Sequence, residues 1–377
     1  MPFHSRYYPS LDGLRGLSII LVMLVHLQLI EPVLGFICPG GKLGVDVFFA
    51  LSGFLITSLL LSESESSGSI DLKHFYYRRA LRLLPALTSV FLFTVLIAFV
   101  VGSFEALGLS RLRLASTALY FTNWVRAYQG PDTWFLGHFW SLAIEEQFYL
   151  CWPVLLVVAT RFRIKPRTMC LAVLGLIGAS VVLKIGLYAS GATTRRIFFG
   201  SDTRGDGILV GCVLAFALKG GLIPTVLNES AARSLKLIGF LLLGIFVVVG
   251  DDRFPLIYLG GTTVVAFAAT LLIAGSILNR SNASRDVLST SLLRWLGRRS
   301  YGLYLWHWPI YELARLVPYR ALVVPCAIVV SIAVAALSFR FLETPFLQIK
   351  DRTRTSGTEF DNQPVSQMIP SCRQSTQ

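Results

Sequence analysis

The first membrane-length apolar segment of the chain, residues 11–30, carries two ionisable side chains. Arg15 and His26 are eleven positions apart, so on a helix they share one face about 16 Å apart. Histidine exchanges a proton near neutral pH, and ionisable groups inside hydrocarbon usually face a polar cavity and mark function. The pair indicates proton-transfer chemistry within the membrane. The alternative is that Arg15 lies at the interface and His26 hydrogen-bonds a neighbouring helix.

The next apolar segment, residues 42–62, also contains polar positions. Asp46 enters it early, and Ser52 and Gly53 interrupt its middle. A carboxylate near a helix start commonly caps the helix or pairs with an arginine. Because Asp46 and His26 are both expected toward the outer ends of adjacent helices, Asp46 is also a candidate catalytic residue that orients His26.

A basic cluster opens the third apolar segment. Arg79 and Arg82 are three positions apart, so both guanidinium groups extend from the same face of a helix. The positive-inside rule explains such a cluster at a cytoplasmic helix end without any further role. Two guanidinium groups on one face also suit a phosphate, which arginine binds through paired hydrogen bonds.

The segment HFWSLAIEEQFYLCWP, residues 138–153, places a hydroxyl and a carboxylate on one helix face. Ser141 and Glu145 are four positions apart, whereas Glu146 points elsewhere. Adjacent glutamates inside a span are unfavourable unless they face a polar cavity or an arginine. We interpret Glu145 as functional, with a structural ion pair as the alternative.

A second histidine lies in the segment SYGLYLWHWPI, residues 300–310. Ser300, Tyr304 and His307 form a single helical stripe between tryptophans. Aromatic residues often mark the membrane interface, but His307 is several residues into the predicted span, too deep for an interfacial belt. We therefore place Tyr304 and His307 among the candidate substrate-binding residues.

Together these groups describe an intramembrane cavity with histidine, carboxylates, hydroxyls and an arginine face toward the cytoplasm. The set suits acyl transfer by general-base catalysis, in which histidine takes the proton of an acceptor hydroxyl as it attacks a thioester. The arginines would hold the phosphates of coenzyme A. The spacing alone suits a proton-coupled transporter equally well. We find no metal-binding, P-loop or dinucleotide motif in the sequence.

The composition predicts the elements that position these residues. The chain has 377 residues, of which 54% are hydrophobic and 15% are charged, against about 25% charged residues in soluble domains. We therefore predict an all-α, multi-pass integral membrane protein. The net charge of +13 indicates cytoplasmic loops and contact with anionic membrane lipids rather than with nucleic acid.

Several of the apolar segments reach the roughly 20 residues that span a bilayer. Ten segments are expected to cross: 12–31, 42–62, 82–102, 139–160, 168–189, 205–220, 236–250, 256–278, 301–316 and 321–342. With a cytoplasmic N-terminus, the basic clusters at 73–82, 161–167, 280–299 and 350–354 all fall on the cytoplasmic side. The sequence thus predicts a helical bundle of about ten spans with both termini in the cytoplasm.

Two regions fit this scheme less simply. The segment 112–124 is apolar but short, so it is expected to lie in the membrane interface or to re-enter the membrane. A full crossing would reverse the orientation of the later spans unless another short span compensated for it. Arg195 and Arg196 fall on the outer side of the membrane in this scheme. The membrane domain is predicted to cover residues 1–347, followed by a polar, disordered cytoplasmic tail at 348–377.

Over residues 8–346 the sequence resembles the acyltransferase-3 family of integral-membrane acyltransferases. The segment LDGLRGLSIILVMLVH carries the family's Arg-x10-His pattern as Arg15 and His26, and RRALRLLPA supplies its Arg-x-x-Arg pair as Arg79 and Arg82. The blocks GVDVFFALSGFLIT, FWSLAIEEQFYLCWP, SYGLYLWHWP and RFLETP follow in the family's order.

The resemblance implies O-acylation, usually O-acetylation, of a glycan or glycolipid in the bacterial cytoplasmic (inner) membrane. Acetyl-CoA is the implied donor substrate, with no bound cofactor and no metal. His26 is then the catalytic base, and Arg15, Arg79 and Arg82 are donor-side residues. Glu145 matches the family's Ser-x3-Glu block, and with Ser141 it is a candidate to bind the acceptor.

The chain ends soon after the membrane domain, so we expect a short family member without an appended SGNH-type hydrolase domain. Short members modify O-antigen, exopolysaccharide, lipo-chitooligosaccharides or macrolides, and the sequence does not select among these acceptors. A proton-coupled transporter or lipid-linked glycan flippase is the alternative prediction. The lack of an inverted sequence repeat weighs against it.

Overall fold

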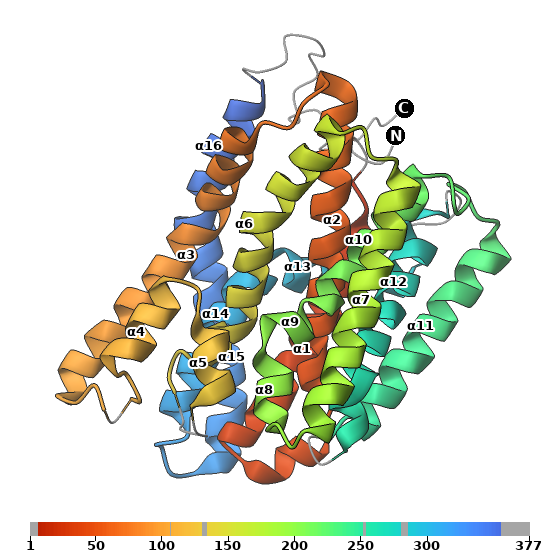
Figure 1. Ribbon diagram of the computed structural model, residues 1–377. Coiled ribbons are helices and arrows are strands. Elements are labelled where there is room, and N and C mark those ends of the chain that lie inside the picture. Colours follow the sequence, from red (N-terminus) through yellow and green to blue (C-terminus); the bar gives the residue numbers. More distant parts are fainter. Residues whose placement is uncertain (1–6, 106, 130–133, 252–253, 280–285, 356–377) are drawn as a thin grey trace, which may run out of the picture.

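The computed structural model describes residues 7–105, 107–129, 134–251, 254–279 and 286–355. Within these ranges the protein is a bundle of helices without strands (Figure 1). Eight helical stretches are long and apolar enough to cross a membrane, since a span needs about 20 residues. The predicted all-α, polytopic fold is confirmed.

The described residues form long helices and shorter helices. The long helices are α1 (Pro9–His26), α2 (Gly44–Ser67), α3 (Leu72–Val101), α6 (Trp140–Arg161), α7 (Pro166–Ala189), α11 (Glu229–Val249), α12 (Thr262–Ile277) and α15 (Arg320–Ser338). The shorter ones are α4 (Arg111–Ala118), α5 (Thr122–Tyr128), α8 (Thr194–Phe199), α9 (Ser201–Arg204), α10 (Asp206–Lys219), α13 (Ser291–Arg298), α14 (Ser300–Ala314) and α16 (Thr344–Thr355).

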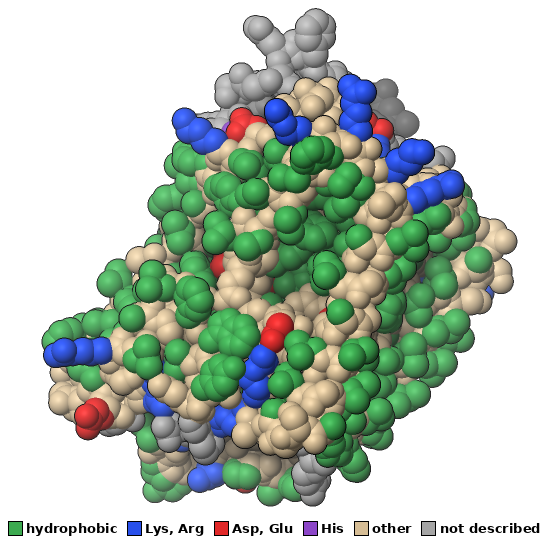
Figure 2. All heavy atoms as spheres, viewed as in Figure 1, with side chains coloured by type: hydrophobic (Ala, Val, Ile, Leu, Met, Phe, Trp, Pro, Cys, Tyr) green, Lys and Arg blue, Asp and Glu red, His purple; other side chains and the backbone are tan. Residues whose placement is uncertain are grey.

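Most of the long helices belong to an inner or an outer group, and α6, with 39% of its apolar window buried, is intermediate. About two-thirds or more of the apolar window is buried in α1, α2 and α12, at 67%, 72% and 67%. In α3, α7, α11 and the stretch containing α15 only 17% to 28% is buried. The outer helices expose leucine, valine and phenylalanine on the flanks of the bundle (Figure 2). That surface is suited to lipid, whereas the inner helices form the core.

Two of the ten predicted spans are shorter than expected. The segments 205–220 and 301–316 form α10 and α14, with 14 and 15 residues, and neither is long enough to span alone. Both are largely buried. Figure 1 shows α8, α9 and α10 following one another along the bundle, so a broken path replaces one continuous helix. Surrounded by protein, these segments can tolerate breaks that lipid would not.

The short apolar segment 112–124 does not cross the bundle. It lies in α4 and α5, which have eight and seven residues. Tyr120 separates the two helices with a left-handed backbone, φ 57°. The Gln147 side chain of α6 donates to the carbonyl oxygen of Tyr120 at 2.7 Å and to Asn123 Oδ1 at 3.0 Å. The loop is therefore held by the half-buried amide of Gln147.

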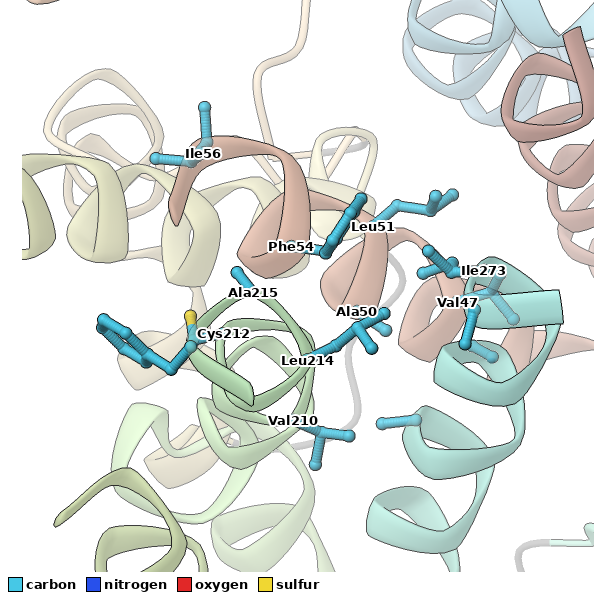
Figure 3. Close-up of a cluster of buried hydrophobic side chains, with 14 of the residues drawn as sticks. Val47, Ala50, Leu51, Phe54, Ile56, Val210, Cys212, Leu214, Ala215 and Ile273 are labelled. Atoms are coloured by element: carbon cyan, nitrogen blue, oxygen red, sulfur yellow. The ribbon is translucent and has the colours of Figure 1, made fainter. Parts of the chain in front are cut away.

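An extensive and close helix contact in the core joins α2 and α10 (Figure 3). A Cβ atom on Gly53 would lie 1.9 Å from the carbonyl oxygen of Ile208, and one on Gly211 would lie 2.0 Å from that of Ala50. Gly53, which interrupts the apolar pattern in the sequence, thus permits close backbone approach without ending the helix.

Buried ion pairs surround this contact. Asp46 of α2 pairs with Arg204 of α9 at 2.8 Å, and Asp206 of α10 pairs with Lys184 of α7 at 2.6 Å. Thr263 of α12 donates to the Asp206 carboxylate as well. All four charged side chains are at most 2% exposed. The charges therefore compensate one another across the membrane-embedded helices.

Arg195 and Arg196, which the predicted topology places on the outer side of the membrane, are held by hydrogen bonds to neighbouring residues. Arg196 binds both oxygens of Asp202, at 2.9 and 2.5 Å, and this carboxylate raises the pKa of Arg196. Arg195 donates to the carbonyl oxygens of Arg126 and Gln129. These contacts join α8 to α5.

Helix α16 continues to Thr355, past the predicted start of a disordered tail at residue 348. The remainder of the predicted tail, residues 356–377, lies outside the described residues.

Candidate active site

A cavity of about 570 Å³ lies between α2 and the first turns of α3, with further lining residues from α6 and α14. We call it the basic cavity because Arg15, Arg78, Arg79 and Arg82 line it. It brings together six of the nine predicted site residues: Arg15, Arg79, Arg82, Ser141, Glu145 and Tyr304.

The arginines of the basic cavity are only partly engaged by the protein. Arg82 makes no hydrogen bond or ion pair with any residue that the structure describes. Arg79 stacks on the Tyr149 ring at 3.7 Å, and Arg15 binds Asp12 at 3.3 Å. The Arg-x-x-Arg spacing thus places both α3 guanidinium groups at the cavity, as predicted from helical periodicity.

Glu145 projects into the same basic cavity from α6. It accepts a hydrogen bond from Ser52 Oγ at 2.6 Å, and among the described residues it forms no ion pair. Ser141, one turn earlier, also lines this cavity. The structural ion pair considered for Glu145 is therefore not formed within the part of the chain that the structure describes. Both residues lie on the arginine side, away from His26.

A second cavity, of about 540 Å³, lies at the other end of the bundle. We call it the histidine cavity because it is lined by His26 and His138, together with Trp140 and Trp308. His26 is half-buried at the C-terminal end of α1, where the chain turns into a short 3-10 helix. The ring is therefore accessible from this cavity.

His26 has a specific partner, His307. The Nδ1 atom of His26 lies 2.9 Å from Nε2 of His307, and Nδ1 of His307 lies 2.9 Å from the carbonyl oxygen of Leu303. A carbonyl only accepts, so His307 carries its proton on Nδ1. When both rings are neutral, His307 Nε2 accepts a hydrogen bond from His26 Nδ1, and Nε2 of His26 is left unprotonated.

A third histidine, His138, completes this cluster and was missed as a candidate. Its ring centroid lies 5.8 Å from that of His307, and its Nε2 lies 3.2 Å from the carbonyl oxygen of Leu305. The only sequence signal was a histidine directly before the α6 segment. Within the described ranges, no three histidine, cysteine or acidic side chains are arranged to hold a metal ion.

The two cavities meet at Val45 and Tyr304, which line both. The Tyr304 hydroxyl donates to the carbonyl oxygen of His138 at 2.9 Å and lies 2.5 Å from Ser141 Oγ. Its single proton is committed to His138, so Ser141 is the donor in the second bond. Tyr304 thus forms a hydrogen-bonded partition between the basic cavity and the histidine cavity.

Asp46 is the predicted catalytic residue that the structure places elsewhere. It is fully buried and forms its ion pair with Arg204. The proposed role of orienting His26 is taken by His307, which no helix-end argument could identify because 281 positions separate the two histidines. Pairing with an arginine, the other role considered for Asp46, is what the structure shows.

Comparison with known proteins identifies the family. The family model described as an acyltransferase domain matches residues 8–340. The chain is 36% identical to a peptidoglycan O-acetyltransferase, OatA, of Listeria monocytogenes, over 91% of this chain and 56% of that protein. It is also 36% identical to the O-acetyltransferase OatA of Staphylococcus aureus, over 91% of this chain and 58% of that protein.

These curated relatives are longer, and the chain spans somewhat over half of their length. No solved structure matches it. The family match nevertheless covers nearly all of the membrane-embedded helices and includes both cavities. The chain belongs to this acyltransferase family.

Proposed function

We propose that the protein transfers an acyl group, preferably acetyl, from acyl-CoA to a hydroxyl of a glycan or glycolipid, with His26 as the general base. One observation carries this proposal: an arginine-lined cavity and a histidine cavity approach from opposite ends of the bundle and meet at Tyr304. The first suits a phosphate-bearing donor, and the second suits proton transfer.

The donor occupies the basic cavity. The 3′,5′-ADP part of coenzyme A carries several phosphates, and these bind the guanidinium groups of Arg15, Arg79 and Arg82. The pantetheine arm then extends toward Tyr304, past Ser141 and Glu145. This assignment moves the last two residues from the acceptor side, where the sequence suggested them, to the donor side.

The chemical step takes place on the other side of Tyr304. Nε2 of His26 removes the proton of the acceptor hydroxyl, and the oxygen attacks the thioester carbonyl carbon. The tetrahedral intermediate collapses with cleavage of the C–S bond, and the thiolate takes the proton back from His26. The products are the ester and free coenzyme A. His307 accepts a hydrogen bond from Nδ1 of His26 throughout, which keeps the ring in one orientation.

The protein lies in the bacterial cytoplasmic membrane, with the basic cavity open to the cytoplasm. The OatA relatives are named as O-acetyltransferases, one of them for peptidoglycan, which supports acetyl as the acyl group and a glycan as the acceptor. The basic loop between α6 and α7 supports the orientation.

The test is transfer of radiolabelled acetyl from acetyl-CoA into the glycan and lipid fractions of membranes containing the protein. Wild type is expected to give base-labile label, as an O-ester requires. His26→Ala is expected to lower the rate by at least about 10²-fold, the usual size of a general-base contribution.

A matched control is His74→Ala. His74 lies at the start of α3 and lines neither cavity, so this variant is expected to transfer label at the wild-type rate. Each protein is first shown to be folded by its elution as a single species in detergent. Near-normal transfer by folded His26→Ala would exclude His26 as the base. Absence of base-labile label with wild type would contradict acyl transfer itself.

A further inference from the structure

Tyr149 lines the basic cavity together with the α3 arginines, and the proposed transfer gives it no role. On α6 it lies one turn after Glu145 and two turns after Ser141, so the three residues form one stripe that lines the cavity. Tyr149 is only 5% exposed and belongs to the same buried apolar cluster as Phe75 and Trp152. Packing therefore fixes the position of its ring.

This ring carries a guanidinium group on its face. The guanidinium carbon of Arg79 lies 3.7 Å from the centroid of the Tyr149 ring, well inside the roughly 6 Å limit for a cation–π contact. Among the described residues Arg79 forms no ion pair, and its Nε–H has no hydrogen-bond acceptor. Within that part of the chain, the Tyr149 ring is therefore the group that holds this guanidinium in place.

Arg79 needs such a support because a like charge is close to it. Arg82 is one turn further along α3, and like charges at this spacing repel each other. An arginine side chain also has many rotamers, and without a contact on its face it would populate those that turn away from the other cation. Stacking restricts Arg79 to the conformation in which it lines the cavity.

Stacking also leaves the guanidinium of Arg79 able to bind an anion. The group is planar and its N–H donors point outward in that plane, whereas an aromatic ring contacts only the flat face. The edge of the group stays available for paired hydrogen bonds to a phosphate. A carboxylate partner would compete with the phosphate for these donors. An aromatic partner holds the cation without opposing anion binding.

A second contact joins the same turns of α3 and α6. The Tyr76 hydroxyl donates to the carbonyl oxygen of Leu150 at 2.7 Å. Tyr76 precedes Arg79 by three positions on α3, and Leu150 directly follows Tyr149 on α6. Tyr76 does not line the basic cavity. Its removal therefore weakens the link between the two helices without removing the ring beneath the guanidinium.

We infer that Tyr149 is a positioning residue for the donor: its ring holds the Arg79 guanidinium at the basic cavity in the orientation that binds a phosphate of acyl-CoA. The inference rests on the proposed function, which places a phosphate-bearing donor in this cavity. Tyr149 acts on the donor through Arg79 and takes no part in proton transfer.

The test measures the Kd of coenzyme A by isothermal titration calorimetry with the full-length protein in detergent. Tyr149→Leu removes the ring and is expected to raise Kd about tenfold, as loss of a partly buried cation–π contact predicts. Tyr149→Phe keeps a ring face and is expected to stay within about threefold of wild type. For Tyr149→Leu, kcat at saturating acetyl-CoA is expected to change little, because the residue does not contact the reacting atoms.

Tyr76→Phe is the matched control. It removes the other side-chain link between the same turns of α3 and α6, so it is expected to lower the melting temperature and to leave Kd unchanged. A rise in Kd as large as that of Tyr149→Leu would show that helix packing, and not the ring, determines donor affinity.

Fluorinated phenylalanines at position 149 test the electrostatic contribution while the shape of the ring is nearly constant. Each fluorine withdraws electron density from the ring face and weakens its attraction for a cation. Kd is expected to rise stepwise from phenylalanine through difluorophenylalanine to trifluorophenylalanine at this position. The series gives the answer even if Tyr149→Leu does not fold, and a purely structural role would produce no such trend.

A double-mutant cycle assigns the effect to Arg79. Arg79→Gln alone is expected to raise Kd about tenfold, as loss of a charge-assisted hydrogen bond predicts. Adding Tyr149→Leu should raise it no further, because the cation is already absent. An equal factor for Tyr149→Leu in both backgrounds overturns the inference.

The remaining outcomes separate this inference from the proposed function. An unchanged Kd in folded Tyr149→Leu, or a Kd that does not respond to fluorination, overturns the inference and leaves acyl transfer intact. Failure of folded wild-type protein to bind coenzyme A would instead contradict the donor site of the proposed function.

Discussion

If His26 is the general base, as proposed, His307 determines which of its ring nitrogens can accept the proton. Its Nδ1 is bound to the carbonyl oxygen of Leu303, and its Nε2 contacts His26. His307→Phe keeps an aromatic ring but removes the acceptor for His26 Nδ1, so the His26 ring loses its preferred tautomer and orientation. We expect kcat to fall by about 10-fold to 10²-fold, within the range of general-base contributions, with little change in the KM for acetyl-CoA.

His307→Gln is the informative companion variant, because a side-chain carbonyl can again accept from His26 Nδ1. It should recover part of the lost kcat. Steady-state kinetics of the three proteins provide the measurement. A fall in kcat that is equal for phenylalanine and glutamine would indicate that His307 contributes only packing, and an unchanged kcat would remove it from the site.

Arg82 offers a second test at the level of single residues. Its guanidinium lines the basic cavity, so Arg82→Gln is expected to raise the KM for acetyl-CoA by about 10-fold, with a smaller effect on kcat, as loss of one hydrogen bond to a charged group predicts. Arg340→Gln is the control, because Arg340 is exposed and outside both cavities. Equal KM values in the two variants would argue against phosphate binding by Arg82.

The sequence predicted the basic cavity better than the histidine cavity. Arg79 and Arg82 are neighbours on one helix, so periodicity alone brings them together. The contact between His26 and His307 joins α1 to α14. The position of the Arg126 side chain in the histidine cavity depends on the loop before α6. Such contacts depend on how helices that are far apart in the sequence pack together, and a single sequence does not specify that packing.

At the scale of helices, the crossing of α2 and α10 depends on glycine. Gly53→Ala places a methyl carbon 1.9 Å from the carbonyl oxygen of Ile208, so the two backbones must separate. We expect a loss of stability of about 1–3 kcal/mol or more, as for other overpacked cores, seen as a lower melting temperature in detergent. Gly244→Ala is the control, because nothing lies within 4 Å of a Cβ there. Similar melting temperatures for the two variants would contradict the close contact.

The buried pair between Asp46 and Arg204 holds α2 against α9. Asp46→Asn leaves the arginine uncompensated, and we expect about 3–5 kcal/mol of destabilisation, typical for breaking a buried ion pair. The double variant Asp46→Asn with Arg204→Gln should be destabilised by less than the sum of the two single variants, because neither charge is then left without its partner. Thermal melting of the four proteins tests this. Strict additivity would show that the two side chains do not interact energetically.

The length of apolar runs predicted the outer helices well, since lipid requires long uninterrupted spans. It was less successful for α10 and α14. Both helices are surrounded by protein rather than lipid. Their apolar segments can therefore contain Asp206 and His307 and can be shorter than a membrane span. Lys184 was overlooked for a related reason. It lies in the middle of an apolar segment, and its partner Asp206 belongs to a different helix.

For the whole molecule, the central feature is that the two cavities are separated by one layer of side chains. Val45 and Tyr304 belong to both linings, and hydrogen bonds to Ser141 and the His138 carbonyl hold Tyr304 in place. In the proposed function, a thioester bound in the basic cavity and a hydroxyl bound in the histidine cavity meet across this layer.

Sidedness follows from this arrangement. The basic loop between α6 and α7 lies at the same end of the bundle as the start of α3 (Figure 1), whose first turns line the basic cavity. Basic loops remain in the cytoplasm. We expect sealed inverted membrane vesicles to use acetyl-CoA added from outside, whereas sealed right-side-out vesicles do not until they are permeabilised. Label retained in the glycan is the readout. Vesicles that contain the Arg82→Gln variant are the control for donor binding, because raising the acetyl-CoA concentration should restore labelling of the glycan. Labelling of intact right-side-out vesicles by external acetyl-CoA would mean that the donor reaches the histidine side, and the assignment of the two cavities would have to be reversed.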